Sequence, residues 1–293
     1  MYRGKFRALK VFFSALLLLG LLSGAAFACT VIAAGKNATV DGSAMITHND
    51  DSRTANSRLF IVPEADWPEG SMRPLIKDAH GYEGDAQQLD EIPQVPHTYR
   101  YFFSRYSFMN EKGVAIAEAT NGVQVTDARS EKVQQIMEKD AAGSLDAWLI
   151  QDVMLERAAS AREAVKIMGD LVEKYGWYDA GETMPLTDGN ETWVIEFYGN
   201  KIWAAWRVPD DEVFVAANRA RLRHLDLTDK ENVMHCPDLV DFAVKNGFIE
   251  AKDVNEKDFS PADVYSPSTE LYSTRREWRV LSLLAPESFK MGP

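Results

Sequence analysis

Residues 192–218 read TWVIEFYGNKIWAAWRVPDDEVFVAAN. In this stretch, runs of β-branched and aromatic residues alternate with the turn formers Gly199-Asn200 and Pro209-Asp210-Asp211, which is the pattern of consecutive β-strands. The expected strands are 192–198, 201–208 and 212–218. Their short connections predict an antiparallel meander.

The segment before the meander has a different periodicity. Between residues 144 and 175 the apolar residues recur every three or four positions, the spacing of helices that bury one face. Ser160 stands three residues before Glu163, which is the spacing of a capping box at a helix start. We therefore expect a pair of helices that ends at Gly176.

The N-terminal part of the chain predicts a hairpin and a long loop. Residues 30–35 and 44–47 are short apolar or β-branched runs joined through an Asp41-Gly42 corner. Residues 59–100 are rich in proline, glycine and acids, which predicts a loop. The order of strands, then helices, then strands predicts an α+β fold in which helices cover the sheets. It favours this fold rather than a doubly wound parallel fold.

The first 28 residues have the features of an export signal. Four basic residues precede an apolar run from Val11 to Leu22, and Ala26-Phe27-Ala28 has the small-x-small pattern of a signal peptidase site. The run is shorter than the roughly 20 apolar residues of a membrane span. We therefore expect a signal peptide over residues 1–28 and a mature domain over 29–293. The mature domain would be periplasmic or secreted, without a stable membrane span.

The mature chain is expected to be strongly acidic. The formal charge of the whole sequence is −12, and loss of the four basic residues in 1–28 changes it to −16. Such a charge repels nucleic acids and anionic lipids, which argues against a nucleic-acid partner. The sequence has no glycine-rich phosphate loop and no metal-binding spacing, and its five histidines are scattered. We expect no cofactor and no metal.

Cleavage after Ala28 would make Cys29 the first residue of the mature protein. Its α-amino group, with a pKa of about 8, could then accept the proton of the adjacent thiol. Two other interpretations of Cys29 remain open at this point. It could carry a lipid, although Ala26 and Phe27 are not the residues that a lipoprotein signal favours. It could also form a disulfide with Cys236, the second cysteine of the chain.

Several blocks of the sequence resemble one enzyme family, in the same order along the chain. The blocks are CTVI at 29–32, DGS at 41–43, NDDS at 49–52, NEKGVAIAE at 110–118, RVPDD at 207–211, FVAAN at 214–218, RREWR at 275–279 and SLLAP at 282–286. The chain resembles the cysteine dipeptidases of the N-terminal-nucleophile (Ntn) hydrolase superfamily, relatives of penicillin V acylase and bile salt hydrolase. The resemblance implies an αββα four-layer sandwich of antiparallel sheets covered by helices.

The resemblance also assigns roles to individual residues. Cys29 would be the nucleophile through its thiol and the base through its amine, and Asp51 would hydrogen-bond to that amine and orient it. Asn218 would lie near the oxyanion, and Arg276 would support the cysteine. Taken alone, Asp51 fits a turn acid and Asn218 fits a strand-end cap.

The chain departs from the family pattern at three points. His48 stands where the superfamily usually has an arginine, so charge assistance to the thiolate there would depend on pH. Thr120 or Asn121 stands where acylase relatives have a second asparagine as oxyanion donor. Members of the family normally continue well beyond the Ala285-Pro286 block, whereas this chain stops at Pro293. We therefore expect a domain truncated at its C-terminus.

These features predict an exported cysteine dipeptidase that hydrolyses the peptide bond of dipeptides through an acyl-enzyme on Cys29. The expected partner is a small peptide substrate. One alternative keeps this chemistry and changes the substrate to a non-peptide linear amide, as in acylases. Another alternative, from a different class, is an extracytoplasmic binding protein in which Cys29 is lipidated or disulfide-bonded.

Overall fold

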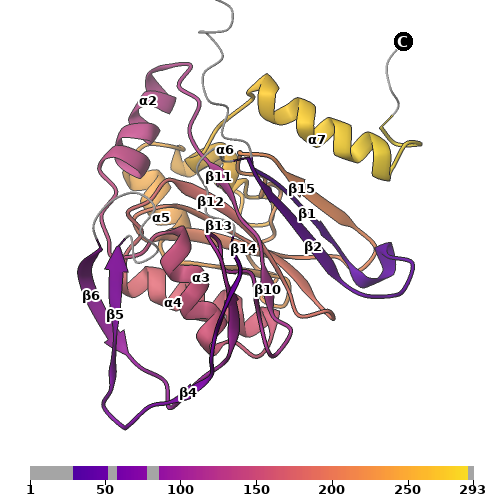
Figure 1. Cartoon of the computed structure of the whole chain (residues 1–293). Helices are drawn as coiled ribbons and strands as arrows, with labels where there is room; N and C mark the ends of the chain where they lie inside the picture. The colour runs from indigo at the N-terminus through magenta and orange to yellow at the C-terminus, as the bar shows by residue number, and fades with distance from the viewer. Residues whose placement is uncertain (1–28, 52–57, 78–85, 290–293) are drawn as a thin grey trace, which may run out of the picture.

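The computed structural model describes residues 29–51, 58–77 and 86–289. The export signal expected over residues 1–28 lies outside the described residues. The remainder is an α+β fold in which antiparallel sheets form the centre and helices lie outside them (Figure 1).

A three-stranded antiparallel sheet contains the first residue of the expected mature chain. β1 (Cys29–Ala34) lies in the middle, between β15 (Val213–Ala216) and β2 (Met45–Asp50). The hairpin predicted for β1 and β2 is confirmed. Its connection contains a short 3-10 turn, η1 (Lys36–Ala38), and Gly42, whose φ of +77° is a conformation that glycine adopts without strain.

A larger antiparallel sheet forms the core of the domain. Its main path runs β16-β14-β13-β12-β10-β9-β8-β3, and β11 also pairs with β12. The bounds are β3 (Phe60–Val62), β8 (Tyr101–Phe103), β9 (Met109–Asn110), β10 (Ala115–Ile116), β11 (Ala119–Asn121), β12 (Gly181–Thr187), β13 (Thr192–Gly199), β14 (Ile202–Val208) and β16 (Val233–His235). β12 and β13 are buried along their whole length, so both of their faces are covered.

Side-chain alternation along β13 shows what covers each face. The ring of Trp193 lies beneath the guanidinium of Arg162, with the ring centroid 4.8 Å from Cζ. The neighbouring Thr192 instead donates a hydrogen bond to the carbonyl oxygen of Ala34 in β1, at 3.1 Å. Successive side chains of a strand point to opposite faces. The helix that carries Arg162 and the three-stranded sheet therefore lie on opposite faces of β13.

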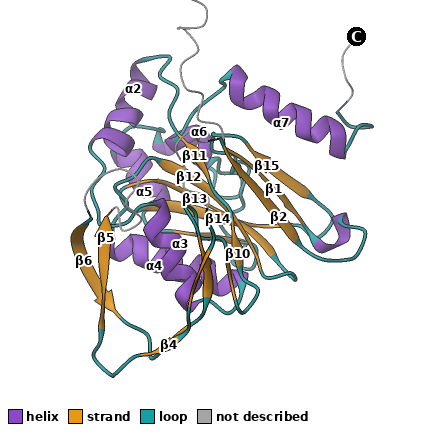
Figure 2. Ribbon diagram, viewed as in Figure 1, coloured by secondary structure: helices purple, strands orange, loops and turns teal. Residues whose placement is uncertain are grey.

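The helices on the first of these faces are the predicted pair. They are α3 (Ala147–Arg157) and α4 (Ala161–Tyr175), and Figure 2 shows them packed against the large sheet. Ser160 caps α4 as expected, because its Oγ accepts a hydrogen bond from the backbone N–H of Glu163 at 3.2 Å. Gly176 ends the helix with a φ of +75°.

A long C-terminal helix, α7 (Leu271–Leu284), packs against β15 on the outer side of the three-stranded sheet (Figure 1). Its buried Glu277 accepts hydrogen bonds from Arg219, at 2.9 Å and 3.0 Å, and pairs with Arg221. The order through the molecule is therefore helices, large sheet, small sheet, helix. The other helical segments are α2 (Ala128–Gln134), η2 (Gln135–Lys139), α5 (Leu239–Lys245), η3 (Ala251–Asp253) and α6 (Pro261–Tyr265).

The loop predicted for residues 59–100 is wrong over much of its length, because short strands occur there. β3 joins the large sheet, and two separate ribbons form from β4 (Ala65–Asp66) with β7 (His97–Thr98) and from β5 (Met72–Lys77) with β6 (Gln87–Pro93). Prolines are tolerated in the second ribbon because each of its two strands has one free edge.

The predicted three-stranded meander is right for β13 and β14 and wrong for the third run. β15 leaves the large sheet and pairs with β1 instead. The turn before it is held against the start of η1, where Asn37 N–H donates to the carbonyl oxygen of Asp210 at 2.7 Å. Gly35 makes this approach possible, because a Cβ there would lie 2.3 Å from the carbonyl oxygen of Pro209.

Candidate active site

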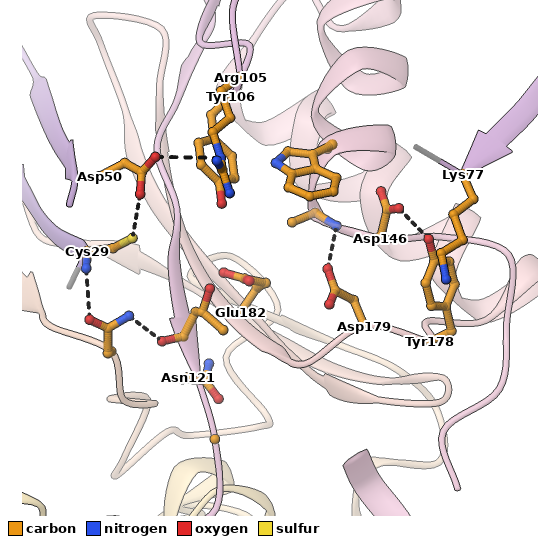
Figure 3. A pocket seen from close by; sticks show the side chains of 15 residues that line it. Cys29, Asp50, Lys77, Arg105, Tyr106, Asn121, Asp146, Tyr178, Asp179 and Glu182 are labelled. Atoms are coloured by element: carbon orange, nitrogen blue, oxygen red, sulfur yellow. Dashed lines mark hydrogen bonds and ion pairs between the residues drawn. The ribbon is translucent and has the colours of Figure 1, made fainter. Parts of the chain in front are cut away.

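A cavity of about 580 Å³ opens beside the first residue of β1. Figure 3 shows Cys29 and Asp50 on one side of it, and Lys77, Asp146, Tyr178 and Asp179 on the other. Arg105, Tyr106 and Glu182 lie between these two groups. The cavity wall therefore presents four carboxyl groups and two cationic side chains.

Strand pairing places an acid directly beside the thiol. Cys29 is opposite Asp50 in the β1–β2 register, so both side chains point to the same face. Cys29 Sγ lies 3.8 Å from Asp50 Oδ1, and Asp50 Oδ2 lies 3.7 Å from Arg105 Nε. Cys29 is 6% exposed, and its thiol forms part of the cavity wall.

The main chain of Cys29 is held from two directions. Its backbone N–H donates to Asn218 Oδ1 at 2.9 Å, and its carbonyl oxygen accepts from Arg276 Nη1 at 2.7 Å. Arg276 also donates to Asn218 Oδ1 from both terminal nitrogens, at 3.0 Å. The Asn218 amide in turn donates to the carbonyl oxygen of Thr120 at 2.9 Å. These contacts fix the position and direction of the strand end without using the sulfur.

The arrangement of elements explains why Asn218 and Arg276 meet there. β15 pairs antiparallel with β1, with Ala216 opposite Val31, so the residue two positions later, Asn218, arrives opposite Cys29. Asn218 turns out of the strand with a φ of +57°, a left-handed conformation that asparagine tolerates better than most residues. Arg276 comes from α7, which packs on β15. The fold thus brings both residues next to Cys29.

A second set of ionisable groups adjoins the sulfur. His48 Nε2 lies 3.1 Å from Glu118 Oε1, and the sulfur of Cys29, a ring nitrogen of His48 and an oxygen of Glu118 all lie within 4.8 Å of one another. Glu182 is buried close to them. Burial, together with the charge of Glu118, raises the pKa of Glu182 well above its ordinary value. Burial would also raise the pKa of Glu118, but the imidazole of His48 outweighs it and lowers that pKa. Glu118 is therefore the ionised member of the two.

These surroundings keep the thiol protonated. Burial raises the pKa of Cys29 far above that of a free cysteine, and the carboxyl groups of Glu118, Asp50 and Glu182 raise it further. A thiolate would be surrounded by negative charge in a space with little water. A base would have to remove the thiol proton before this sulfur could act as a nucleophile.

Asp51, which the family resemblance places at the α-amine of Cys29, is the last residue of the described segment 29–51. Its side chain is exposed, and its Oδ1 accepts a hydrogen bond from Asn49 Nδ2 at 3.1 Å. Among the contacts of the described residues, none joins Asp51 to Cys29. Asp50, the last residue of β2, pairs with Cys29 in the strand register and faces the thiol. Asp50 is thus an acid beside the thiol that the sequence did not predict, and the role of Asp51 toward the amine stays a prediction.

Thr120 and Asn121 both line the cavity, but their side chains have different partners. Asn121 Nδ2 donates to Thr183 Oγ1 at 3.1 Å, and its Oδ1 accepts from Ser266 Oγ at 2.9 Å. Both ends of this amide are therefore engaged within the protein. The hydroxyl of Thr120 contacts the carboxyl group of Glu182, and Thr120 is the better placed of the two to face a substrate.

The opposite side of the cavity is built around the start of α3. Asp146 caps this helix, because its Oδ1 accepts from Leu149 N–H at 2.8 Å, and its other oxygen pairs with the hydroxyl of Tyr178. Asp179 Oδ2 accepts from Ala147 N–H at 3.3 Å. Lys77 Nζ lies 5.1 Å from the centroid of the Tyr178 ring. A substrate that extends from Cys29 would reach charges of both signs here.

Residues 28–291 match the model of peptidase family C69. The chain belongs to this family. It is 29% identical to a protein of Latilactobacillus sakei named probable dipeptidase, over 277 residues that make up 89% of this chain and 54% of that protein. It is 31% identical over 244 residues to a probable dipeptidase of Salmonella dublin, which covers 80% of this chain and 52% of that protein. A dipeptidase of Bifidobacterium longum is 26% identical over 280 residues, 88% of this chain and 51% of that protein. The C69 chain spans about half the length of these relatives.

Several residues of this site were not predicted from the sequence. Glu118 ends an apolar run, Val114–Ala117, and an acid directly after a buried strand is a signal that could have suggested a buried carboxylate. Asp50 is adjacent to Asp51 in the sequence. The sequence does not show the strand register that places Asp50 opposite Cys29. Glu182 and Arg105 lie in segments with no distinguishing pattern, and the fold alone brings them to Cys29.

The disulfide interpretation of the C69 chain is not supported. Cys29 and Cys236 are both free in the structure. Cys236 Sγ instead accepts a hydrogen bond from Trp203 N–H at 3.5 Å, next to the edge strand β16 of the large sheet. In the described part of the chain, no helix has the length and apolar character needed to cross a membrane.

Proposed function

We propose that this chain is an exported cysteine dipeptidase whose nucleophile is Cys29, at the N-terminus of the mature protein. Membership of peptidase family C69 and the names of its relatives support hydrolysis of peptide bonds. The signal-like residues 1–28 support export and cleavage before Cys29. One observation carries the proposal: Asn218 and Arg276 hold the main chain of Cys29, while its thiol forms part of the wall of a charged cavity.

The proposed reaction uses the α-amine of Cys29 as the base. The thiol proton passes to this amine while Sγ forms a bond to the carbonyl carbon of the substrate. The resulting ammonium gives its proton to the leaving nitrogen, the C–N bond breaks, and a thioester remains. Water then adds to the thioester, and the acid leaves with regeneration of the thiol. Asn218 Oδ1, which accepts from the nitrogen of Cys29 at 2.9 Å, would hold the amine in place during these steps.

A protonated thiol suits this mechanism. The pKa of Cys29 is raised by burial and by the surrounding carboxyl groups, so a standing thiolate is disfavoured. The α-amine of Cys29, which belongs to the same residue as the thiol, can remove the thiol proton at the moment of attack. The negative charge then passes to the substrate oxygen. The carboxyl groups near the sulfur then favour a transfer that leaves no charge on it.

The charges of the cavity favour dipeptides over acylated amides. A free dipeptide has an ammonium group at one end and a carboxylate at the other, and the cavity has four carboxyl groups and two cationic side chains. The acyl chain of an acylase substrate would instead lie against these charged groups, which costs free energy because they lose water without gaining partners. We assign free dipeptides as the substrate class.

The order of layers supports placing the fold among the αββα sandwiches of Ntn hydrolases. α3 and α4 cover one face of the large sheet, the small sheet covers the other, and α7 lies outside the small sheet. Cys29 begins the middle strand of the small sheet, so the proposed nucleophile lies between the two sheets.

The test compares two forms of the chain. One begins at Cys29, and the other carries an uncleavable Gly-Ser extension before Cys29. We expect the first to hydrolyse dipeptides and the second to be slower by about 100-fold or more, because the extension converts the amine into an amide that cannot act as a base. Alkylation of Cys29 by iodoacetamide, followed by mass spectrometry, checks that the thiol is accessible in both forms.

Equal rates for the two forms would show that the amine of Cys29 is not the base. The substrate panel should contain dipeptides, their N-acetyl derivatives and N-acylated amino acids. Faster hydrolysis of the acylated amino acids than of the dipeptides would overturn the substrate assignment and favour the acylase alternative.

A further inference from the structure

Cys29, His48 and Glu118 form a compact group of three different metal-ligand types. One ligand atom from each lies within 4.8 Å of the other two, and the His48 and Glu118 atoms are 3.1 Å apart. Zinc bonds to sulfur, imidazole nitrogen and carboxylate oxygen measure about 2.0–2.3 Å, so ligand atoms around one tetrahedral ion are about 3–4 Å apart. The imidazole and carboxylate already have this spacing. The sulfur would need to approach by up to about 1–2 Å.

The buried polar atoms of this group are poorly satisfied by the protein. Glu118 is fully buried. Its carboxylate lies close to Cys29, His48 and Glu182. Within the described residues, however, neither of its oxygens makes a hydrogen bond of regular geometry, and the same is true of His48 Nε2. His48 Nε2 and Glu118 Oε1 are 3.1 Å apart, in close contact but poorly aligned for a hydrogen bond. Buried carboxylates without good hydrogen bonds are costly unless a cation compensates them.

The charges of the group match those of a divalent cation. A Cys29 thiolate and the Glu118 carboxylate together carry two negative charges, and a neutral His48 adds none, so a zinc ion would leave the site with no net charge. Asp50, whose Oδ1 lies 3.8 Å from the sulfur, adds negative potential that attracts a cation from the cavity. Zinc accepts sulfur, nitrogen and oxygen ligands together, whereas magnesium and calcium prefer oxygen alone.

We propose that Cys29, His48 and Glu118 bind one Zn²⁺ ion that reversibly blocks the nucleophile. On binding, the thiol releases its proton to solvent, an S–Zn bond forms, and no atom is oxidised or reduced. Inhibition rests on the proposed function of Cys29, but binding of the ion does not.

The first test measures binding on the chain that begins at Cys29. Zinc affinity is measured by competition with a chromophoric chelator, and Co²⁺ replaces zinc to reveal a cobalt–thiolate charge-transfer band in the near ultraviolet. We expect one ion per chain and a band that disappears in Cys29→Ala. His48→Gln and Glu118→Gln should each weaken zinc binding by at least about 100-fold, because each removes a direct ligand. Circular dichroism checks that each variant is folded.

His235 and Cys236 provide the matched control, since they are the other neighbouring histidine and cysteine of the chain. His235→Gln and Cys236→Ser should leave zinc affinity and the cobalt band unchanged. Three results would overturn the site: no stoichiometric binding, a cobalt complex without the thiolate band, or affinity that depends on His235 and Cys236 and not on His48 and Glu118.

The second test concerns inhibition and uses the hydrolysis assay. Zinc should inhibit at concentrations that match its measured affinity, and a chelator should restore the full rate. If the chain binds zinc as described but hydrolyses no dipeptide, the metal site stands and the proposed function fails. If the chain hydrolyses dipeptides and zinc at saturating concentration leaves the rate unchanged, the blocking role is wrong.

Discussion

Cys29 and Cys236 are both buried thiols, but they lie in different surroundings. Both belong to the hydrophobic core. Cys236 is 1% exposed and accepts a hydrogen bond from Trp203 N–H. Burial raises its pKa to about 12. Cys29 is 6% exposed and forms part of the wall of a charged cavity, and carboxyl groups add to the effect of burial on its pKa.

The comparison shows that burial and a raised pKa do not by themselves distinguish a reactive cysteine. Both thiols are protonated at neutral pH, so neither is a standing nucleophile. What distinguishes Cys29 is access to a cavity, a main chain held by Asn218 and Arg276, and the amine that cleavage after Ala28 would supply. Cys236 does not line the cavity beside Cys29, and cleavage after Ala28 would give it no α-amine.

The largest expected effect tests this difference directly. Cys29→Ala should reduce dipeptide hydrolysis by at least about 1,000-fold, because the acyl-enzyme can no longer form. Cys236→Ala should retain a rate within about twofold of the original and lose about 1–2 kcal/mol of stability, because it removes a buried sulfur. Steady-state rates and urea unfolding measure the two quantities. A loss of activity in Cys236→Ala without unfolding would show that hydrolysis also depends on Cys236.

The next largest effect concerns the groups that hold Cys29. Arg276→Ala removes the donor to the carbonyl oxygen of Cys29 and both hydrogen bonds to Asn218 Oδ1. We expect kcat/KM to fall by about 100-fold, because misplacement of a nucleophile by about 1 Å has effects of this size.

Arg275→Ala is the control for Arg276→Ala. Arg275 is the neighbouring residue of α7, and its side chain is exposed, so its loss should leave kcat/KM within about twofold. Thermal unfolding of both variants separates a local effect from loss of the helix. Equal effects of the two substitutions would show that Arg276 acts through α7 and not through Cys29.

The smallest effect concerns the charge beside the sulfur. Asp50 helps to raise the pKa of Cys29, so Asp50→Asn should lower that pKa and increase the thiolate fraction at a given pH. In a Cys236→Ala background, alkylation of Cys29 by iodoacetamide should become about three- to tenfold faster at neutral pH. The pH at which the alkylation rate of Cys29 begins to rise should be lower than in the original chain.

Asp51→Asn is the matched control for this measurement, because Asp51 is the adjacent acid and its exposed side chain contacts Asn49. It should leave the alkylation profile unchanged. A larger effect of Asp51→Asn than of Asp50→Asn would support the role that the sequence-based resemblance assigned to Asp51.

Local patterns predicted the parts of the fold that depend on neighbouring residues. The helical pair, the Ser160 cap and the β1–β2 hairpin follow from periodicity and turn residues within short stretches. The prolines of residues 59–100 were misleading, because a two-stranded ribbon accommodates proline at its edges. The third strand of the meander was misplaced because the sequence of β15 fits either sheet.

The sequence by itself determined which residue is the candidate nucleophile, since Cys29 follows a cleavage pattern, and it pointed to Asn218 and Arg276 through the family resemblance. Tertiary structure alone decided that β15 pairs with β1, that Asp50 faces the sulfur, and that His48, Glu118 and Glu182 gather around it. The physical reason is that a local pattern specifies which face of an element is buried, whereas the partner of that face depends on contacts between residues far apart in the chain.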